Sequence, residues 1–198
     1  LMSKKRRRIA FIVEGLKTEE QYLKSLKKYF FSDTEFDVIC IPADGNIYMM
    51  WKKLKEDDFE TDIIELIREQ CEKSEKRLGG LSRDDFMEIY LLFDFDPHQN
   101  NLKLSDGENS QSVLLDMMGT FDNETEHGKL YISYPMVEAL RDITEASCQP
   151  FYQCAIPLSD IPNYKQLTGE GKNTYTAVKK YNKATWMMII SIFLIRCR

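Results

Sequence analysis

The chain has 198 residues, a formal net charge of -5, 43% hydrophobic and 30% charged side chains. This length and apolar fraction suit one compact domain with a real core, and the negative charge argues against general affinity for polyanions. The five cysteines are odd in number and form no CxxC pair. They indicate reduced, mostly buried thiols rather than a disulfide or zinc framework.

The N-terminal half alternates strand and helix patterns. The continuous apolar run over 9–13 predicts a strand buried on both faces, and it stops at Glu14-Gly15. Thr18 with Gln21 three residues on matches a capping box for the next helix. The other elements predicted in this half are a helix over 19–30, a strand over 36–42, and helices over 46–56 and 60–78.

The second half continues the alternation. An apolar run predicts a strand over 88–93, which ends at Asp94-Phe95-Asp96. The elements predicted after it are a helix over 110–121, a strand over 129–133 and a helix over 136–143 that Pro135 opens. This order predicts an α/β domain over 9–145 with a largely parallel sheet flanked by helices.

Residues 146–198 predict a small helical extension that packs on this domain. It contains a predicted helix near 174–184 and an apolar stretch over 186–195, which is too short to span a bilayer. That stretch is expected to pack as a core helix or as the interface helix of a homodimer. The basic run 4–8 precedes only five apolar residues, so no secretory signal and no membrane partner are expected, and the predicted location is cytoplasmic.

Acidic side chains fall where the predicted strands end. Glu14, Asp94, Asp96 and Ser133 all lie at carboxyl ends of strands, where α/β sheets gather their ligands. Asp94 and Asp96 are two positions apart, so an extended strand projects both carboxylates to one side, with Phe95 turned into the core. With Glu14 they form a plausible cage for Mg²⁺ or Mn²⁺. Alternatively, the two aspartates merely end a strand, and Glu14 is an ordinary turn residue.

Several further side chains are candidates for the same site. Gly15 permits a tight turn and a close approach by substrate, and Lys17 and Arg141 could offset the charge of a phosphate. His98 is a candidate phosphate contact or an ordinary loop histidine. Glu138 and Asp142 share a predicted helix face, where they either supply ligands for a second metal or lie in solvent.

The segment Ile12-Val13-Glu14-Gly15, followed by Lys17-Thr18-Glu19 and Tyr22-Leu23, with Asp94-Phe95-Asp96 downstream, resembles the Toprim catalytic domain of topoisomerases, primases and OLD-type nucleases. Within that group it is most similar to the RloB-like and OLD-associated branch. Residues 132–138 are similar to that branch's S-N-P-x-x-E segment, with Tyr134 in place of the asparagine. The resemblance covers roughly residues 9–142.

The resemblance implies a Toprim fold and metal-dependent cleavage or transfer of phosphodiesters in DNA or RNA. It implies that Asp94 and Asp96 bind Mg²⁺, that Glu14 acts as acid/base or ligand, and that Glu138 serves a second site. It also implies a role in anti-phage defence beside an ABC/OLD-type ATPase partner.

Rival functions remain open from the sequence. A glycosyltransferase also uses a strand-end DxD, although it would not need Glu14. A haloacid-dehalogenase-like phosphatase normally carries its DxD near the N-terminus. A catalytically inactive Toprim module would bind nucleic acid or an ATPase partner without cleaving anything.

Overall fold

The computed structural model describes residues 7–15, 17–32, 36–95, 110–134, 136–142, 156–170 and 177–196. The strands are β1 (Arg7–Val13), β2 (Phe36–Pro42), β3 (Phe86–Asp94), β4 (Asp122–Asn123) and β5 (Gly128–Ser133). The α-helices are α1 (Thr18–Phe30), α2 (Ile47–Glu56), α3 (Ile63–Gln70), α4 (Glu72–Leu78), α5 (Ser110–Thr120), α6 (Tyr164–Glu170) and α7 (Lys183–Arg196). The 3₁₀ helices are η1 (Arg83–Asp85), η2 (Val137–Asp142), η4 (Leu158–Asn163) and η5 (Val178–Lys180).

The strands form one five-stranded sheet in the order β2-β1-β3-β5-β4. β1 pairs in parallel with β2 and β3, and β3 pairs in parallel with β5. The short β4 is antiparallel to β5. These pairings confirm the predicted α/β domain with a largely parallel sheet.

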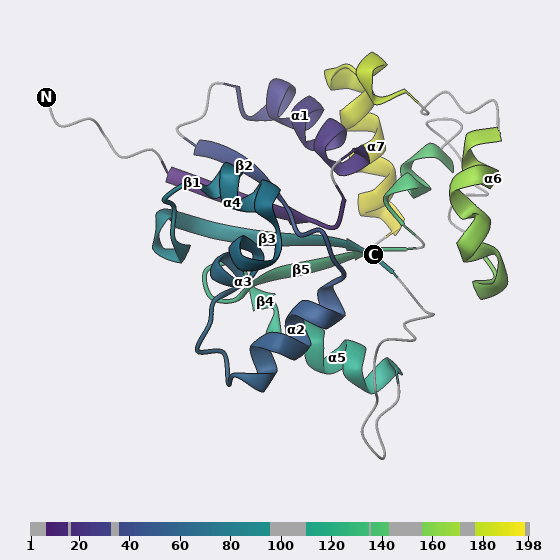
Figure 1. Cartoon of the computed structure of the whole chain (residues 1–198). Helices are drawn as coiled ribbons and strands as arrows, with labels where there is room; N and C mark the ends of the chain where they lie inside the picture. Colours follow the sequence, from purple (N-terminus) through teal and green to yellow (C-terminus); the bar gives the residue numbers. More distant parts are fainter. Residues whose placement is uncertain are drawn as a thin grey trace, which may run out of the picture.

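Helices cover both faces of the sheet (Figure 1). α2 and α5 lie on one side, whereas α1 and α7 lie on the other. The larger core cluster joins Ala10, Ile12 and Leu91 of the sheet to apolar side chains of α2, α3 and α5. A smaller cluster joins Tyr22 of α1 to Trp186 of α7, to Val178 of η5 and to Tyr181, which follows η5. The sheet is therefore the middle layer, and the C-terminal helices pack against α1.

Side-chain caps explain where two of the helices begin. Asn46 Oδ1 accepts a hydrogen bond from the backbone N–H of Met49 at 3.0 Å, and Asp62 Oδ1 accepts one from Ile64 at 2.7 Å. Each bond satisfies an amide that the first helical turn leaves without a partner.

The predicted capping box at the start of α1 was wrong. Lys17 is the N-cap residue of this helix, and its side chain makes no capping hydrogen bond. Thr18 lies inside the helix, and its hydroxyl instead donates to Glu138 Oε1 at 3.4 Å. The beginning of α1 is therefore tied to a residue far away in the sequence.

Three other element predictions need correction. The helix predicted over 60–78 is interrupted at Cys71, whose backbone is extended between α3 and α4. The helix predicted over 136–143 is the 3₁₀ helix η2, and within the described residues the one predicted near 174–184 is reduced to η5 and the beginning of α7. α6 was not predicted, because its polar sequence lacks an apolar repeat.

No helix in the described ranges is both long enough and apolar enough to cross a membrane.

Gly128 provides a test of how tightly β5 packs on β3. Its φ is +109°, and an added Cβ would lie 3.2 Å from Ile89 Cγ2 and 3.3 Å from Leu91 Cγ. Both of these side chains are fully buried. We expect Gly128→Ala to lower the free energy of unfolding by about 2 kcal/mol, because the new methyl group adds backbone strain and a clash.

The matched control is Gly119→Ala in α5, where an added Cβ meets no atom within 4 Å. Alanine there should stabilise the helix by roughly 0.5 kcal/mol. Urea unfolding of the two variants measures both effects. Equal stabilities of the two variants would contradict the packing described at Gly128.

Candidate active site

β1 and β3 are adjacent strands whose onward connections leave in opposite directions. The chain passes from β1 through α1 to β2 on one side, and from β3 through α5 to β5 on the other (Figure 1). In open parallel sheets, such a switch point leaves a crevice outside the carboxyl ends of the two strands. Glu14 follows β1, and Asp94 is the last residue of β3, so both acids lie at this point.

A direct hydrogen bond joins these two acids across the switch point. Glu14 Oε2 accepts from the backbone N–H of Asp94 at 3.1 Å, although the residues are 80 positions apart. The predicted convergence of Glu14 with Asp94 is therefore found. Asp96 and His98, which were predicted to complete the site, lie outside the described residues.

The Asp94 carboxylate also holds the beginning of η2. Its Oδ1 accepts a hydrogen bond from the backbone N–H of Val137 at 2.8 Å. On the next strand, Ser133 pairs with Asp94, and its carbonyl accepts from the N–H of Phe95 at 2.9 Å. Ser133 thus borders the site, and the first residue of η2 is hydrogen-bonded to the Asp94 carboxylate.

Phe95 was expected to turn into the core, and this was wrong. Its ring is partly exposed and lies 5.3 Å from the ring of Tyr134, centroid to centroid. The Tyr134 hydroxyl donates to the carbonyl of Ile156 at 3.1 Å. Tyr134 therefore links the edge of the site to the chain before η4.

Burial and like charges shift the titration of Asp94. Its pKa is raised to about 7, and the largest cause is burial of the carboxyl group. The hydrogen bond from Val137 opposes this rise, whereas the negative charges of Glu14, Glu19 and Glu138 add to it. Several carboxylates are thus close enough to repel one another, as in sites built for a cation.

Glu19 reaches this cluster from the first turn of α1 and was not among the predicted site residues. A Cβ at Gly15 would lie 3.2 Å from Glu19 Oε2 and 3.4 Å from Oε1. The glycine therefore leaves room for the glutamate to fold back over the turn. The signal in the sequence is the acidic residue that follows Lys17-Thr18 in the first turn of the helix.

Glu138 is a buried carboxylate beside this cluster, with only 2% of its surface exposed. Its Oε1 lies 3.9 Å from the Arg141 guanidinium and 3.8 Å from the Lys165 ammonium. Its Oε2 is buried without a hydrogen-bond partner in the described part of the chain. The expectation that Glu138 belongs to the site is consistent with this position, whereas an exposed helix face is excluded.

The predicted cationic residues occupy different positions. Lys17 is exposed at the start of α1, whereas Arg141 faces Glu138 and lies close enough to Tyr22 to influence the pKa of its hydroxyl. Burial raises that pKa, and Arg141 lowers it. Lys165 of α6 was not predicted, because nothing in its local sequence indicates that α6 packs against η2. The side chain of Asp142 lies outside the described residues.

The donor set at the switch point fits a hard divalent cation. Glu14 and Asp94 supply carboxylate oxygens, which Mg²⁺ and Mn²⁺ prefer. Among the described residues the buried Glu138 Oε2 has no hydrogen-bond partner. A cation would also relieve the repulsion that adds to the effect of burial on the pKa of Asp94. Within the described residues, which omit Asp96 and His98, no group of three His, Cys, Asp or Glu side chains is arranged to hold a metal.

The raised pKa of Asp94 predicts a pH-dependent stability. In the metal-free protein, the folded state holds a proton on Asp94 that the unfolded state has already lost, so stability falls as the pH rises from about 4 to about 7. Asp94→Asn mimics the protonated carboxyl and removes this loss. Above pH 7 we expect the free energy of unfolding of this variant to exceed that of the wild type by on the order of 2 kcal/mol. Thermal unfolding in the presence of EDTA measures this difference. A constant difference in Tm from pH 4 to 8 would contradict this.

The ion pair between Glu138 and Arg141 predicts that a substitution at Glu138 lowers stability. Glu138→Gln removes the negative charge beside Arg141 and leaves a guanidinium without its partner in a mostly buried setting. We expect a loss of about 2 kcal/mol in the free energy of unfolding. The control is Glu75→Gln on an exposed face of α4, which should change stability by less than about 0.5 kcal/mol. Equal Tm values for the two variants would show that the Glu138–Arg141 pair contributes nothing.

Comparisons with protein-family models, with curated proteins and with solved structures find no match to this chain.

Proposed function

We propose that this chain is a Toprim-like, metal-dependent nuclease that hydrolyses phosphodiester bonds of DNA or RNA. The observation that carries the proposal is the contact between Glu14 and Asp94 at the switch point of the sheet. A purely structural role for these residues would not require two carboxylates on adjacent strand ends, together with Glu19 and Glu138 near enough to affect titration. The motif order around Glu14 and Asp94 supports the Toprim assignment.

Glu14, Asp94 and Asp96 are the proposed ligands of Mg²⁺ or Mn²⁺. Such a cation would supply charge stabilisation at the phosphate and a more acidic bound water. Glu14 is held in place by the N–H of Asp94, and we assign it the proton of the attacking water. Asp94 must be ionised to act as a ligand, so its pKa near 7 makes metal affinity fall in mildly acidic solution.

The cations around the site suit the substrate's charge. Lys17 is exposed at the beginning of α1, and Lys165 is exposed beside Glu138. Lys17 can approach a phosphate freely, whereas Lys165 would do so at the expense of its ion pair with the buried Glu138. Arg141 is instead engaged with Glu138, so we assign it a positioning role for that carboxylate rather than a direct phosphate contact.

The alternative is a Toprim module that binds nucleic acid or an ATPase partner without cleaving. The hydrogen bond from Val137 to Asp94 favours it, because this carboxylate already has a structural role as the cap of η2. A glycosyltransferase is less well supported, since its DxD would not need Glu14. An ATPase partner and a role in anti-phage defence follow from the Toprim resemblance and are part of the proposal.

Cleavage of fluorescent single-stranded DNA, single-stranded RNA and duplex DNA tests the proposal. We expect activity with Mg²⁺ or Mn²⁺ and none in EDTA. Asp94→Asn and Glu14→Gln should each lower kcat/KM by at least about 100-fold, because each removes a group required in the transition state. Mg²⁺ should raise the Tm of the wild type more than that of Asp94→Asn.

Glu75→Gln, purified in the same way, controls for contaminating nucleases and for the loss of one acidic charge. Unreduced cleavage by both site variants would rule out these carboxylates as the catalytic residues. Retained nucleic-acid binding with no cleavage in any metal would favour the non-catalytic module.

A further inference from the structure

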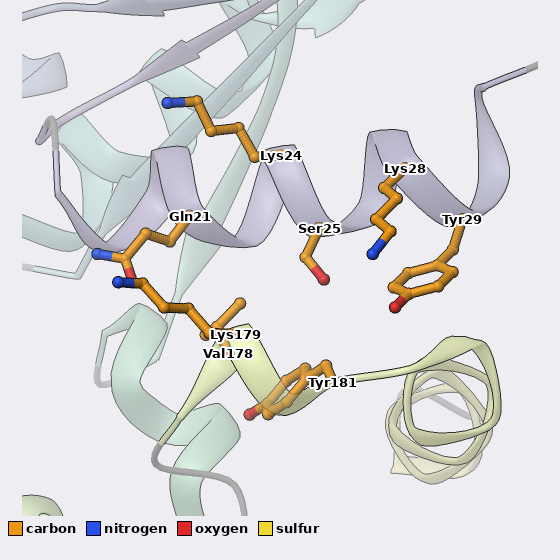
Figure 2. A pocket seen from close by; sticks show the side chains of 8 residues that line it. All are labelled: Gln21, Lys24, Ser25, Lys28, Tyr29, Val178, Lys179 and Tyr181. Carbon is orange, nitrogen blue, oxygen red and sulfur yellow. The ribbon is translucent and has the colours of Figure 1, made fainter.

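A pocket of about 300 Å³ opens between α1 and η5, on the side of α1 that faces the C-terminal helices. Figure 2 shows the residues that line it. They are Gln21, Lys24, Ser25, Lys28 and Tyr29 from α1, with Val178, Lys179 and Tyr181 from the segment of η5. This volume is at the lower end of the range for small-ligand sites and suits a single nucleotide.

The polar groups of this pocket favour an anion. The Lys28 amine and the Ser25 hydroxyl point into the space between α1 and Tyr181 (Figure 2). Lys179 extends from the opposite wall toward Gln21, at the other end of the pocket. Lys24 points away from this space, and its amine lies 3.2 Å from Glu20 Oε1. The described residues that line the pocket include no carboxylate, which is notable in a chain with a net charge of -5.

The pocket also offers aromatic surface for a base. Tyr29 and Tyr181 both line it, and the Lys28 amine lies 5.1 Å from the centroid of the Tyr29 ring. Lysines beside aromatic rings are the combination with which proteins hold unpaired nucleotides: the amines attract the backbone, and the rings stack on bases. A paired base would present no free face to such a pocket.

The floor of the pocket is built on packed side chains. Trp186 Nε1 donates a hydrogen bond to Ser25 Oγ at 2.9 Å, and its ring meets the ring of Tyr181 edge-on at 5.2 Å. Ser25 therefore accepts from Trp186 and still has its own proton to donate to a ligand. Because these contacts exist before any ligand binds, little ordering of the floor is required on binding.

The pocket lies on the helix that leads away from the candidate active site. α1 begins at Thr18, whose hydroxyl contacts Glu138, and Ser25 is about 10 Å further along the same helix axis. A strand with one phosphate at Glu14 and Asp94 could therefore reach the pocket with a nucleotide only a few positions away.

We propose that this pocket binds an unpaired nucleotide of a single-stranded nucleic acid, a few positions from the phosphodiester at the carboxylate site. Lys28 and the Ser25 hydroxyl contact its phosphate, Tyr29 contacts its base, and Lys179 contacts the phosphate of a neighbouring nucleotide at the other end of the pocket. The proposal rests on the nuclease function proposed above and names its substrate as single-stranded. The substrate strand would lie along α1, between the carboxylate site and the pocket.

Binding without catalysis separates this proposal from the nuclease function. Fluorescence anisotropy in EDTA measures the affinity of the full chain for labelled single-stranded DNA, single-stranded RNA and a blunt duplex, over a series of salt concentrations. We expect either single strand to bind more tightly than the duplex. The double variant Lys28→Ala/Lys179→Ala should bind single strands roughly tenfold more weakly and lower the slope of log K against log salt by about 1.4, because two phosphate contacts are lost.

Lys53→Ala/Lys73→Ala removes two exposed lysines of α2 and α4 and controls for net charge. This control should retain the wild-type slope, and Lys28→Arg/Lys179→Arg should restore it. Both mutated pocket lysines are exposed, so folding is expected to survive, and thermal unfolding checks this. An unchanged slope in the alanine double variant, or equal affinity for duplex and single strand, would overturn the proposal.

Activity on different substrate lengths distinguishes the two proposals. With Mg²⁺, the alanine double variant should cleave bis(p-nitrophenyl) phosphate like the wild type but show a raised KM on long oligonucleotides. If the double variant cleaves long oligonucleotides as efficiently as the wild type, the proposal for the pocket is wrong and the nuclease function still stands. If the protein cleaves no substrate but binds single strands with the predicted salt slopes, the proposal for the pocket is supported and the nuclease function is wrong.

Discussion

The parallel pairing of β1 with β3 is the constraint on which the candidate site depends. Its register sets Val13 opposite Leu92, which brings Glu14 and Asp94 to the same edge of the sheet. β1 is buried on both faces, and Ala10 is fully inaccessible. A slip of one residue would carry Glu14 into the buried part of the pairing, where its carboxylate would lose contact with water. The strand pairing thus brings the two acids to one edge of the sheet, and the hydrogen bond from the N–H of Asp94 to Glu14 fixes the Glu14 carboxylate there.

The charges at this edge are arranged unevenly. Arg141 and Lys165 both approach Glu138, whereas Asp94 experiences mainly burial and the negative charges around it. Burial, and to a smaller degree the anionic neighbours, raise the pKa of the Asp94 carboxyl. The two acids of this small site therefore lie in opposite electrostatic surroundings. That division suits Glu138 for a structural ion pair and Asp94 for a metal ligand.

Much of the sheet could be predicted because strands buried on both faces appear in the sequence as continuous apolar runs. The break at Cys71 could not, since Ile67, Cys71 and Ser74 continue the same inward-facing stripe through it. The convergence of Glu14 with Asp94 followed from the rule that ligands gather at strand ends. The burial of Glu138 could not be predicted, because its neighbours Thr18 and Lys165 come from elements distant in the chain. The spacing of residues around Glu138 does not indicate these contacts.

The raised pKa of Asp94 has a consequence for how metal uptake would be measured. Near pH 7 this carboxyl holds about half a proton on average, and a cation that binds there must displace it. The displaced protons pass to the buffer, so the heat recorded by calorimetry would include the buffer's own enthalpy of ionisation. Titrations in two buffers of different ionisation enthalpy would then report directly on the protonation of one side chain at the end of β3.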